Sequence, residues 1–511
     1  MMFFNKNISI LLLFSLSIFY AKDIKSNIDY NNNCKKAYEF VLSFHFNKSD
    51  SILEIEKHKH PDNSVVEAIK CSASFLKYFN YNTKTYLDEY YRNYKIAIDK
   101  IEAENSDNPY KLYLLSDLYL HSAFINALQS NYITAIVRFK KAYNSIYKNK
   151  EKYPDFLLNK KSLGLINITI GSIPKNYNWT LSILKLKGNT KLGNQQLENL
   201  LTSCIQKKEY NYLFVESLVL FSYTHYSFGN KVDTNNLLFT IFNDQHYSNY
   251  YSNNQIFTFS KASYFKHLKH NNMAIKALED IQSEFTNNPY KLFYLDYIFG
   301  ECLLYKNDIR SIFYFDRYLS NYTGKNYLKS AIYKKSWMYL LNGNINAYKA
   351  EMSKINSIGV SFFDSDKQAQ KAAEKNIIPN VEILKSRLLF DGGYYQKANF
   401  VLQNAFKNGH IKSKHDQLEY IYRLARIYDA LGDDEIAEIY YKLTIEKGRD
   451  MPYYFAANSA LNLGYYYEHN GQLSKAMKMY SLCLELDYDE YQNSITQKAK
   501  NGINRIEFLD D

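Results

Sequence analysis

Proline and glycine are both scarce in this sequence: 511 residues contain only seven prolines and 17 glycines. Proline interrupts helices and glycine weakens them, so this composition leaves room for long helical stretches. Leu, Lys, Glu, Ala and Tyr recur at helical spacing along the chain. The sequence therefore favours a mostly helical protein.

Cysteine is also rare, and its spacing indicates no disulfide framework. None of the five cysteines belongs to a CxxC pair; they are Cys34, Cys71, Cys204, Cys302 and Cys483. An exported chain could form a disulfide, but no pair stands out from the spacing. Cys483 occupies a small-residue position in the repeat described below, so we expect it to be buried.

Motifs of common enzymes and nucleotide-binding proteins are absent. The chain has no GxGxxG, P-loop or GxSxG sequence. Closely spaced histidines could bring imidazoles together as metal ligands, but they lack acidic or cysteine partners in register. We interpret them as exposed helix residues; they are His58 with His60, His267 with His270, and His410 with His415. We expect no catalytic residue, cofactor or metal.

The positive charge is modest for a chain of this length. The formal net charge is +11, from 63 basic and 52 acidic residues. This excess allows weak attraction to anionic surfaces, but there is no dense Arg/Lys block of the kind that nucleic-acid binders carry. We therefore expect no nucleic-acid partner.

One long apolar run occurs, and it lies at the N-terminus. Residues 1–21 combine the basic residue Lys6, an apolar run from Ile8 to Tyr20 and the small residue Ala21. This run is shorter than the roughly 20 residues that span a bilayer, so it predicts a signal peptide. An uncleaved anchor is the alternative, because Phe19 is bulky near the cleavage position. We expect export to the periplasm or to the outer membrane.

A repeat of 39 residues organises the C-terminal part of the chain. Two copies within residues 418–486 match at six positions with the spacing 3, 4, 5, 4 and 3. The matched residues are Ala425, Tyr428, Gly432, Ala437, Tyr441 and Thr444 in one copy, and Gly464, Tyr467, Gly471, Ala476, Tyr480 and Cys483 in the next. A weaker copy precedes them with Ser386, Leu389, Gly393, Ala398, Leu402 and Ala405.

This pattern predicts paired antiparallel helices. The small residues allow two helices to approach, the tyrosines fill the gap to the next pair, and Gly393, Gly432 and Gly471 form turns with φ > 0. The pattern resembles the tetratricopeptide repeat, whose period is about 34 residues, so we expect longer links between units. The predicted fold is all-α, with tetratricopeptide-type repeats in a right-handed superhelical solenoid. Ordinary amphipathic helices are the alternative.

Echoes of such units occur further upstream. Residues 107–113 (DNPYKLY) match residues 287–293 (NNPYKLF). Pro109 and Pro289 suit the first turn of a helix, with Asn108 and Asn288 as N-caps. We therefore expect a signal peptide, degenerate helical repeats on either side of an insert, and C-terminal repeats. The corresponding ranges are 1–21, 22–161, 162–200 for the insert, 201–380 and 381–511.

The insert at 162–200 interrupts the helical rhythm with glycines and a proline. It resembles the tetratricopeptide repeat protein 39 family, related to inclusion-body clearance, at Gly164, Leu165, Ile166, Asn167, Ser172, Pro174, Leu186, Gly188 and Gly193. The chain's close, QKAKNGINRIE, resembles that family and related exported proteins of Bacteroidetes-like bacteria. The resemblance, over roughly 31–507, implies a helical repeat fold without catalytic residues. Better-known members are intracellular, so their cellular role is not carried over.

Tyrosine is abundant, with 51 residues. Helical geometry assigns Tyr441 and Tyr467 to the core and leaves Tyr440, Tyr465 and Tyr466 for partner binding. We therefore expect a concave aromatic groove that binds a protein or peptide. Tyrosine that replaces Phe or Leu under codon bias is the alternative.

These features predict a non-enzymatic interaction scaffold or adaptor in the cell envelope. The first alternative is a lipid- or glycan-associated adaptor with peripheral membrane attachment. The second is an enzyme that uses the glycine-rich insert, where glycines could line a pocket; we favour glycines that let helices cross closely. Polar groups there are Asn167, Thr169, Lys175, Asn176 and Tyr177.

Overall fold

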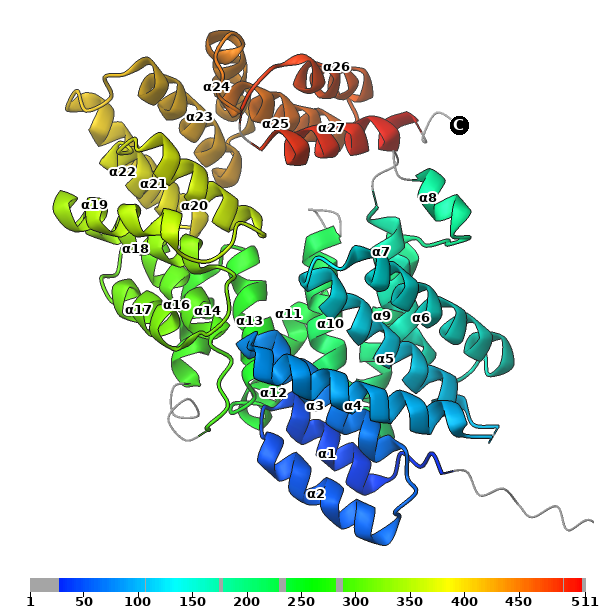
Figure 1. Ribbon diagram of the computed structural model, residues 1–511. Helices are drawn as coiled ribbons and strands as arrows, with labels where there is room; N and C mark the ends of the chain where they lie inside the picture. Colours follow the sequence, from blue (N-terminus) through cyan, green and yellow to red (C-terminus); the bar gives the residue numbers. More distant parts are fainter. Residues whose placement is uncertain are drawn as a thin grey trace, which may run out of the picture. The chain divides into compact units, whose positions relative to one another are not determined.

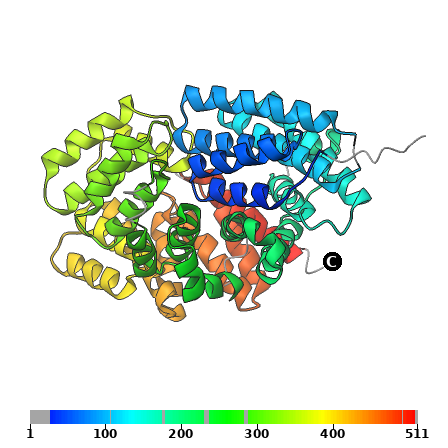
Figure 2. The same cartoon turned by 90° about the horizontal axis from the view of Figure 1, so that it is seen from below.

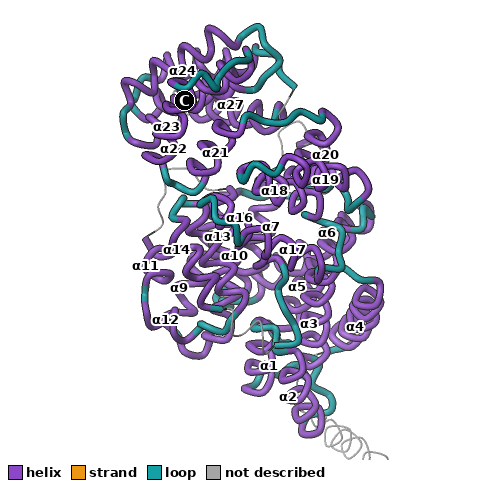
Figure 3. Tube along the Cα trace, turned by 90° about the vertical axis from the view of Figure 1, so that its left-hand side faces the viewer, coloured by secondary structure: helices purple, strands orange, loops and turns teal. Residues whose placement is uncertain are grey.

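Helices form nearly all of the regular structure of this protein. The computed structural model describes residues 27–105, 107–173, 178–228, 236–281, 288–489 and 491–507. These ranges contain many helices and no strand (Figure 3), so the predicted all-α class is confirmed. None of the described helices is long and apolar enough to cross a membrane. The predicted signal peptide at 1–21 lies outside the described residues.

The chain divides into two compact units. The N-terminal unit comprises Met1–Ser260 with Ser283–Leu292, and the C-terminal unit comprises Lys261–Gln282 with Phe293–Asp511. The division passes through α13 (Gln255–His267).

The N-terminal unit is built from neighbouring helix pairs. Helix α1 packs on α2, α3 on α4, α5 on α6, and α7 on α9; Figure 2 shows the first blue helices lying side by side. Its other elements are α1 (Asn32–Leu42), α2 (Phe46–Lys59), α3 (Val65–Tyr81), α4 (Lys84–Ala103), α5 (Pro109–Leu128), α6 (Tyr132–Lys152), α7 (Asn159–Gly171), α8 (Asn178–Ile183), α9 (Thr190–Gln206), the 3₁₀ helix η2 (Lys208–Leu213), α10 (Phe214–Phe228), α11 (Asn236–Asn243) and α12 (Gln245–Tyr250).

The two NPYKL segments have different structures. Helix α5 begins at Pro109, and Asn108 accepts a hydrogen bond from the Tyr110 backbone N–H at 2.9 Å, as predicted. The prediction for Pro289 is wrong, because the next helix begins only at Tyr294. The side chain of Gln255 donates to the Tyr290 carbonyl and accepts from the Leu292 N–H, so the backbone is satisfied without a helix.

The glycine-rich segment 162–200 also forms a helix pair, α7 with α9. A Cβ on Gly164 would lie 2.7 Å from Leu197 Cγ, and a Cβ on Gly193 would lie 2.7 Å from the Gly164 carbonyl oxygen. Both glycines therefore allow a close helix crossing, as we favoured from the sequence. Residues Pro174 to Tyr177, including Lys175 and Asn176, lie outside the described residues.

The C-terminal unit continues the pairing (Figure 1). Helix α16 packs on α17, α18 on α19, α21 on α22, α23 on α24, and α25 on α26. Its elements are α14 (Asn271–Asp280), α16 (Tyr294–Tyr305), α17 (Ser311–Asn321), α18 (Leu328–Leu341), α19 (Ile345–Lys354), the 3₁₀ helix η3 (Ile355–Ser357), α20 (Asp364–Lys375), α21 (Val381–Asp391), α22 (Tyr395–Lys407), α23 (Lys414–Leu431), α24 (Asp434–Gly448), α25 (Phe455–His469), α26 (Leu473–Glu485) and α27 (Gln492–Glu507).

The three sequence copies coincide with the pairs α21–α22, α23–α24 and α25–α26. The turn glycines Gly393, Gly432 and Gly471 have φ of 82°, 79° and 69°, as predicted for these turns. The small and large positions of the repeat form the core between helices. Residues at these positions that are buried include Ala398, Leu402, Ala405, Ala425, Ala437, Tyr441, Tyr467, Ala476, Tyr480 and Cys483.

Tyr428 lies between two copies, since it packs against the cores of both the α21–α24 and the α23–α27 regions. All five cysteines are buried with free thiols.

Candidate functional site: an arginine and aromatic surface

First helices of successive pairs pack on one another in the C-terminal unit: α18 contacts α21, α21 contacts α23, and α23 contacts α25 (Figure 1). Cationic and aromatic side chains gather along this row. We call the following set the arginine–aromatic cluster: Trp337, Arg387, Tyr422, Arg423, Arg426 and Tyr454.

The repeat explains the position of two of these arginines. Arg387 and Arg426 are 39 residues apart, and each directly follows a buried small residue, Ser386 or Ala425. A residue one step along a helix is turned by about 100° from its predecessor, so both arginines leave the pair interface at equivalent positions. Tyr465, after Gly464, is the third residue of this series.

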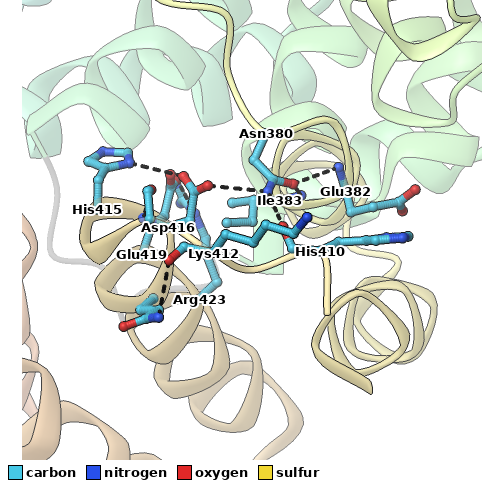
Figure 4. Close-up of polar contacts among 11 residues, drawn as sticks. Asn380, Glu382, Ile383, His410, Lys412, His415, Asp416, Glu419 and Arg423 are labelled. Carbon is cyan, nitrogen blue, oxygen red and sulfur yellow. Dashed lines mark hydrogen bonds and ion pairs between the residues drawn. The ribbon is translucent and has the colours of Figure 1, made fainter. Parts of the chain in front are cut away.

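The Asn380 side chain connects the N-terminal ends of α21 and α23, which are the first helices of two successive pairs (Figure 4). Its Oδ1 accepts from the Glu382 N–H at 3.1 Å and caps α21. Its Nδ2 donates to the His410 carbonyl at 3.0 Å and to the Asp416 carboxylate at 3.3 Å. These bonds couple the α22–α23 link and the first turn of α23 to the beginning of α21.

Arg387 lies against an indole ring. Its guanidinium carbon is 5.4 Å from the ring centre of Trp337, a cation–π distance. Its Nε is 3.9 Å from Asp391 Oδ2, and 31% of the Arg387 side chain is exposed. Tyr333 packs edge-on against Trp337 at 4.5 Å, and burial raises the pKa of Tyr333 to about 12. This phenol therefore stays neutral and can act as a hydrogen-bond donor.

Arg423 forms an ion pair with a neighbouring carboxylate. Its Nε and Nη2 both donate to Glu419 Oε1, at 3.1 and 2.7 Å. The two side chains are one helical turn apart, and only 7% of Arg423 is exposed. This pair has little capacity for a partner and fixes the shape of the surface.

Arg426 is different, because its charge meets aromatic rings and a hydroxyl group. Its Nη1 donates to Tyr422 Oη at 3.0 Å, and Tyr422 Oη donates in turn to Asn458 Oδ1 at 3.1 Å. Its guanidinium carbon lies 5.0 Å from the ring centre of Phe390. Within the described ranges Arg426 forms no ion pair.

Positive charge therefore exceeds negative charge at this surface. Partial burial and the charge of Arg426 lower the pKa of Lys498 on α27. With Arg387, Arg423 and Lys498, Arg426 makes four cations near three carboxylates, Asp391, Glu419 and Asp429, of which Asp429 accepts a hydrogen bond from Tyr441. A carboxylate or phosphate of a partner would relieve this excess.

The three tyrosines predicted to bind a partner occupy different surroundings. Tyr440 stacks on Tyr428 at 5.8 Å. Tyr465 packs edge-on against Tyr480 at 5.8 Å, with Arg505 over its ring.

The third, Tyr466, packs on Tyr467 at 5.4 Å. The charges that act on it come from α24: the carboxylates of Glu438, Asp434 and Glu435 raise its pKa, and Lys442 has a smaller opposite effect. Sequence reasoning assigned the groove to these tyrosines and missed Arg387 and Arg426, although their 39-residue spacing was a readable signal.

Histidines do not gather into a metal centre in the described part of the chain, where no group of three or more His, Cys, Asp or Glu is placed to hold an ion. His58, His60, His267, His270 and His410 are exposed. His415 Nδ1 lies 3.3 Å from Asp416 Oδ1 and belongs to the network around Asn380 (Figure 4).

The N-terminal unit also contains a cluster of buried charged residues of the types that occur in catalytic sites. Lys161 Nζ lies 2.9 Å from Asp117 and 2.7 Å from Glu216, and Tyr38 donates to Glu216 at 2.9 Å. Lys161 is 2% exposed and Asp117 is 6% exposed. Because these groups are enclosed by α1, α5, α7 and α10, we interpret the cluster as structural.

Comparison with protein-family models gives no match, and no curated protein is similar to the chain at a significant level. The resemblance to the tetratricopeptide repeat protein 39 family therefore stays a prediction, and the functional argument rests on the geometry above.

Proposed function

We propose that this chain is a non-enzymatic scaffold or adaptor for protein–protein interactions in the cell envelope. In this proposal the arginine–aromatic cluster binds an extended acidic segment of a protein partner. The observation that carries it is Arg426, a partly buried guanidinium bonded to Tyr422 and packed on Phe390 that has no ion-pair partner in the described residues.

The chemistry of the cluster suits a segment with a carboxylate beside an aromatic or aliphatic side chain. The carboxylate would form charge-assisted hydrogen bonds with Arg426 and Arg387. Tyr454 is partly exposed and offers amphipathic contact area with little loss of side-chain entropy, whereas Trp337 is buried and supports Arg387 from within the unit. Aromatic residues and arginine are the types that dominate binding energy at protein interfaces.

The repeat architecture supports the same interpretation. We infer that the pairs from α21 to α26 are tetratricopeptide-type repeats stacked in a right-handed superhelix, with their first helices lining the concave side. Three such pairs share a 39-residue register, and their turn glycines have similar backbone geometry. Export through residues 1–21 places the partner in the envelope.

The test is crosslinking capture from the native cell with matched variants of the tagged full chain. An envelope protein that wild-type protein captures should be lost with Arg426→Ala and kept with Arg449→Ala, because Arg449 is an exposed arginine outside the cluster. The captured partner should carry an acidic segment, and a synthetic peptide of that segment should bind the purified chain. Equal capture by both variants would overturn the assignment to this cluster.

The same experiment separates the cluster from the tyrosines predicted by sequence. Tyr466→Ala changes a ring packed on Tyr467 and near acidic groups of α24. We expect this variant to keep the partner. Loss with Tyr466→Ala and retention with Arg426→Ala would instead support the original tyrosine prediction.

A specific observation also favours attachment to a membrane surface as a second candidate function. Four neighbouring apolar side chains on α6 are exposed: Tyr132 by 55%, Ile133 by 80%, Ile136 by 45% and Val137 by 50%. Further along the same helix lie Lys141 and Lys148, both exposed. Apolar residues followed by lysines are typical of helices that lie in an anionic lipid interface.

Flotation with vesicles tests this second candidate. Wild-type protein should float with vesicles that contain anionic phospholipid and be released at high salt, while Ile133→Ser/Val137→Ser protein should stay at the bottom. Flotation of both proteins to the same extent would exclude α6 as the attachment surface.

A further inference from the structure

A separate open cavity lies in the C-terminal unit, between the turn after α16 and the pair α21–α22. Its volume is about 440 Å³, within the range of pockets that hold small ligands. Three lysines line it and no Asp or Glu does. These lysines come from three elements: Lys306 from the end of α16, Lys385 from α21 and Lys397 from α22.

The cavity has an apolar wall below this basic rim. Leu389, Phe400 and Val401 form the wall, and 67% of the Phe400 side chain is exposed. An exposed phenylalanine beside a cavity is apolar area that a ligand can cover, at a gain of about 25 cal/mol per Å². The lining thus combines positive charge and apolar surface.

The positive charge at the rim is only partly balanced within the described residues, where Lys306 acts on the Asp308 carboxylate, which is itself paired with Arg310. Over the described residues, none of Lys306, Lys385 and Lys397 forms an ion pair, and Lys397 only approaches the Tyr394 ring at 5.8 Å. The Oδ1 atom of Asn307, another lining residue, is buried without a hydrogen-bond partner. Buried polar atoms are normally satisfied, and this oxygen is an acceptor, so it needs a donor such as the ammonium group of a rim lysine rather than a carboxylate.

We propose that this cavity binds an aliphatic carboxylate of the fatty-acid type. Its carboxylate lies among Lys306, Lys385 and Lys397, and its chain covers Leu389, Phe400 and Val401. A peptide fits less well, because each residue brings a backbone N–H and a C=O that need partners. The Tyr394 hydroxyl already donates to Asn272 and accepts from Asn271, so apart from the lysines the lining offers only the side-chain amides of Asn307 and Gln396.

This inference is independent of the scaffold proposal, because it uses none of the residues of the arginine–aromatic cluster. A purified full chain that binds an aliphatic carboxylate and no protein partner would leave it intact. The converse result would leave the scaffold proposal intact.

Isothermal titration of the full chain with monomeric dodecanoate tests the proposal. We expect saturable binding at one site, and binding weaker by at least about tenfold for the neutral dodecanol. The variant Lys306→Gln/Lys385→Gln/Lys397→Gln should lose affinity for dodecanoate by at least about tenfold, and Val401→Trp should block the apolar wall.

The matched control is Lys412→Gln/Lys447→Gln/Lys478→Gln, three exposed lysines of the same unit that do not line the cavity. It should bind as wild type, and circular dichroism should show equal helix content for all variants. Absence of saturable binding, equal loss in the control, or affinity for dodecanol equal to that for dodecanoate would overturn the proposal. Binding to vesicles of anionic phospholipid without binding to free dodecanoate would also overturn it.

Discussion

The ring of Tyr480 lies so close to Gly464 that a Cβ on this glycine would be 2.3 Å from the tyrosine Cε1. On its other side the same ring meets Gly502, where a Cβ would lie 2.5 Å from Cε2. Tyr480, on α26, is fully buried between α25 and α27. Two glycines thus admit one aromatic ring, which joins the last helix to the repeat array.

Replacement of Gly464 by alanine should destabilise the C-terminal unit by about 2 kcal/mol or more, because the added methyl group displaces a fully buried ring. Gly432→Ala is the matched variant. Nothing lies within 4 Å of a Cβ there, but φ is +79°, so we expect a loss of only about 1 kcal/mol. Urea unfolding followed by circular dichroism measures both losses, and an equal or larger loss for Gly432→Ala would contradict this account.

Local patterns in the sequence predicted the part of the fold that local contacts determine. Gly432 and Gly471 have the predicted positive φ, and Tyr441 and Tyr467 are buried, since helical geometry alone places these residues. The predicted helix start at Pro289 was wrong, because side chains far away in the sequence, such as Gln255, form hydrogen bonds with the neighbouring backbone groups. A residue pattern does not contain such long-range contacts.

The candidate site was harder to predict from the sequence, for a related reason. Tyr465 and Tyr466 are adjacent, and which ring faces a neighbouring helix depends on how the pairs stack. Arg387 is part of the cluster through Trp337, 50 residues earlier, on a helix outside the 39-residue register. The arginine series within the repeat could be read from spacing, whereas its aromatic partner required the structure.

The lysine shared by two carboxylates should be essential for the N-terminal unit. Lys161→Met removes the cation that neutralises Asp117 and Glu216, while it keeps most of the side-chain volume. Loss of one partner from a buried ionic group costs about 3–5 kcal/mol, because the remaining charge is buried without compensation. Hydrogen–deuterium exchange in peptides of α5, α7 and α10 should rise strongly in this variant.

The control for Lys161 is Lys150→Met, which changes an exposed lysine of α6. We expect wild-type exchange in that variant. The pair Lys161→Met/Glu216→Gln should recover part of the lost stability, because burial already raises the pKa of Glu216. Unchanged protection of α5, α7 and α10 in Lys161→Met would show that the ionic cluster does not stabilise the unit.

His121 should make the N-terminal unit less stable in mild acid. It stacks on Phe75 at 4.1 Å, and burial lowers its pKa from the ordinary 6.5 to about 4, although Asp117 acts in the opposite direction and Lys161 in the same one. As pH falls from 6.5 to 4, the unfolded chain gains a proton that the folded chain does not, so stability decreases by up to about 3 kcal/mol.

The variant His121→Phe should remove this pH dependence and keep the stacking on Phe75. Hydrogen-exchange protection of α5 at pH 5 relative to pH 7.5 measures this pH dependence. Glu216, whose pKa is also raised, is present in both proteins and therefore does not contribute to the difference between them. If the wild type and the variant lose the same protection at pH 5, the histidine is not the cause.

Glu301 should give the C-terminal unit its resistance to acid. Its carboxylate lies 2.6 Å from Lys266 Nζ and also pairs with Lys334. Burial alone would raise its pKa, but the two lysines outweigh it and lower the pKa from 4.5 to about 2. The group thus contributes stability that is fully present above about pH 4.5 and is lost as pH falls through about 2, by about 3 kcal/mol in total.

Glu301→Gln should therefore destabilise the unit by about 3 kcal/mol at pH 7, because Lys266 and Lys334 lose their shared partner. Below pH 4.5 the difference from wild type should shrink, because Glu301 of the unfolded wild-type chain takes up a proton that the folded chain does not. Glu374→Gln serves as a control, since Glu374 is an exposed carboxylate of α20 in the same unit. Hydrogen-exchange protection of α16 and α18, measured between pH 7 and pH 3, reports the stability of both variants. If the difference between Glu301→Gln and wild type stays constant over this range, the lysines do not lower the Glu301 pKa.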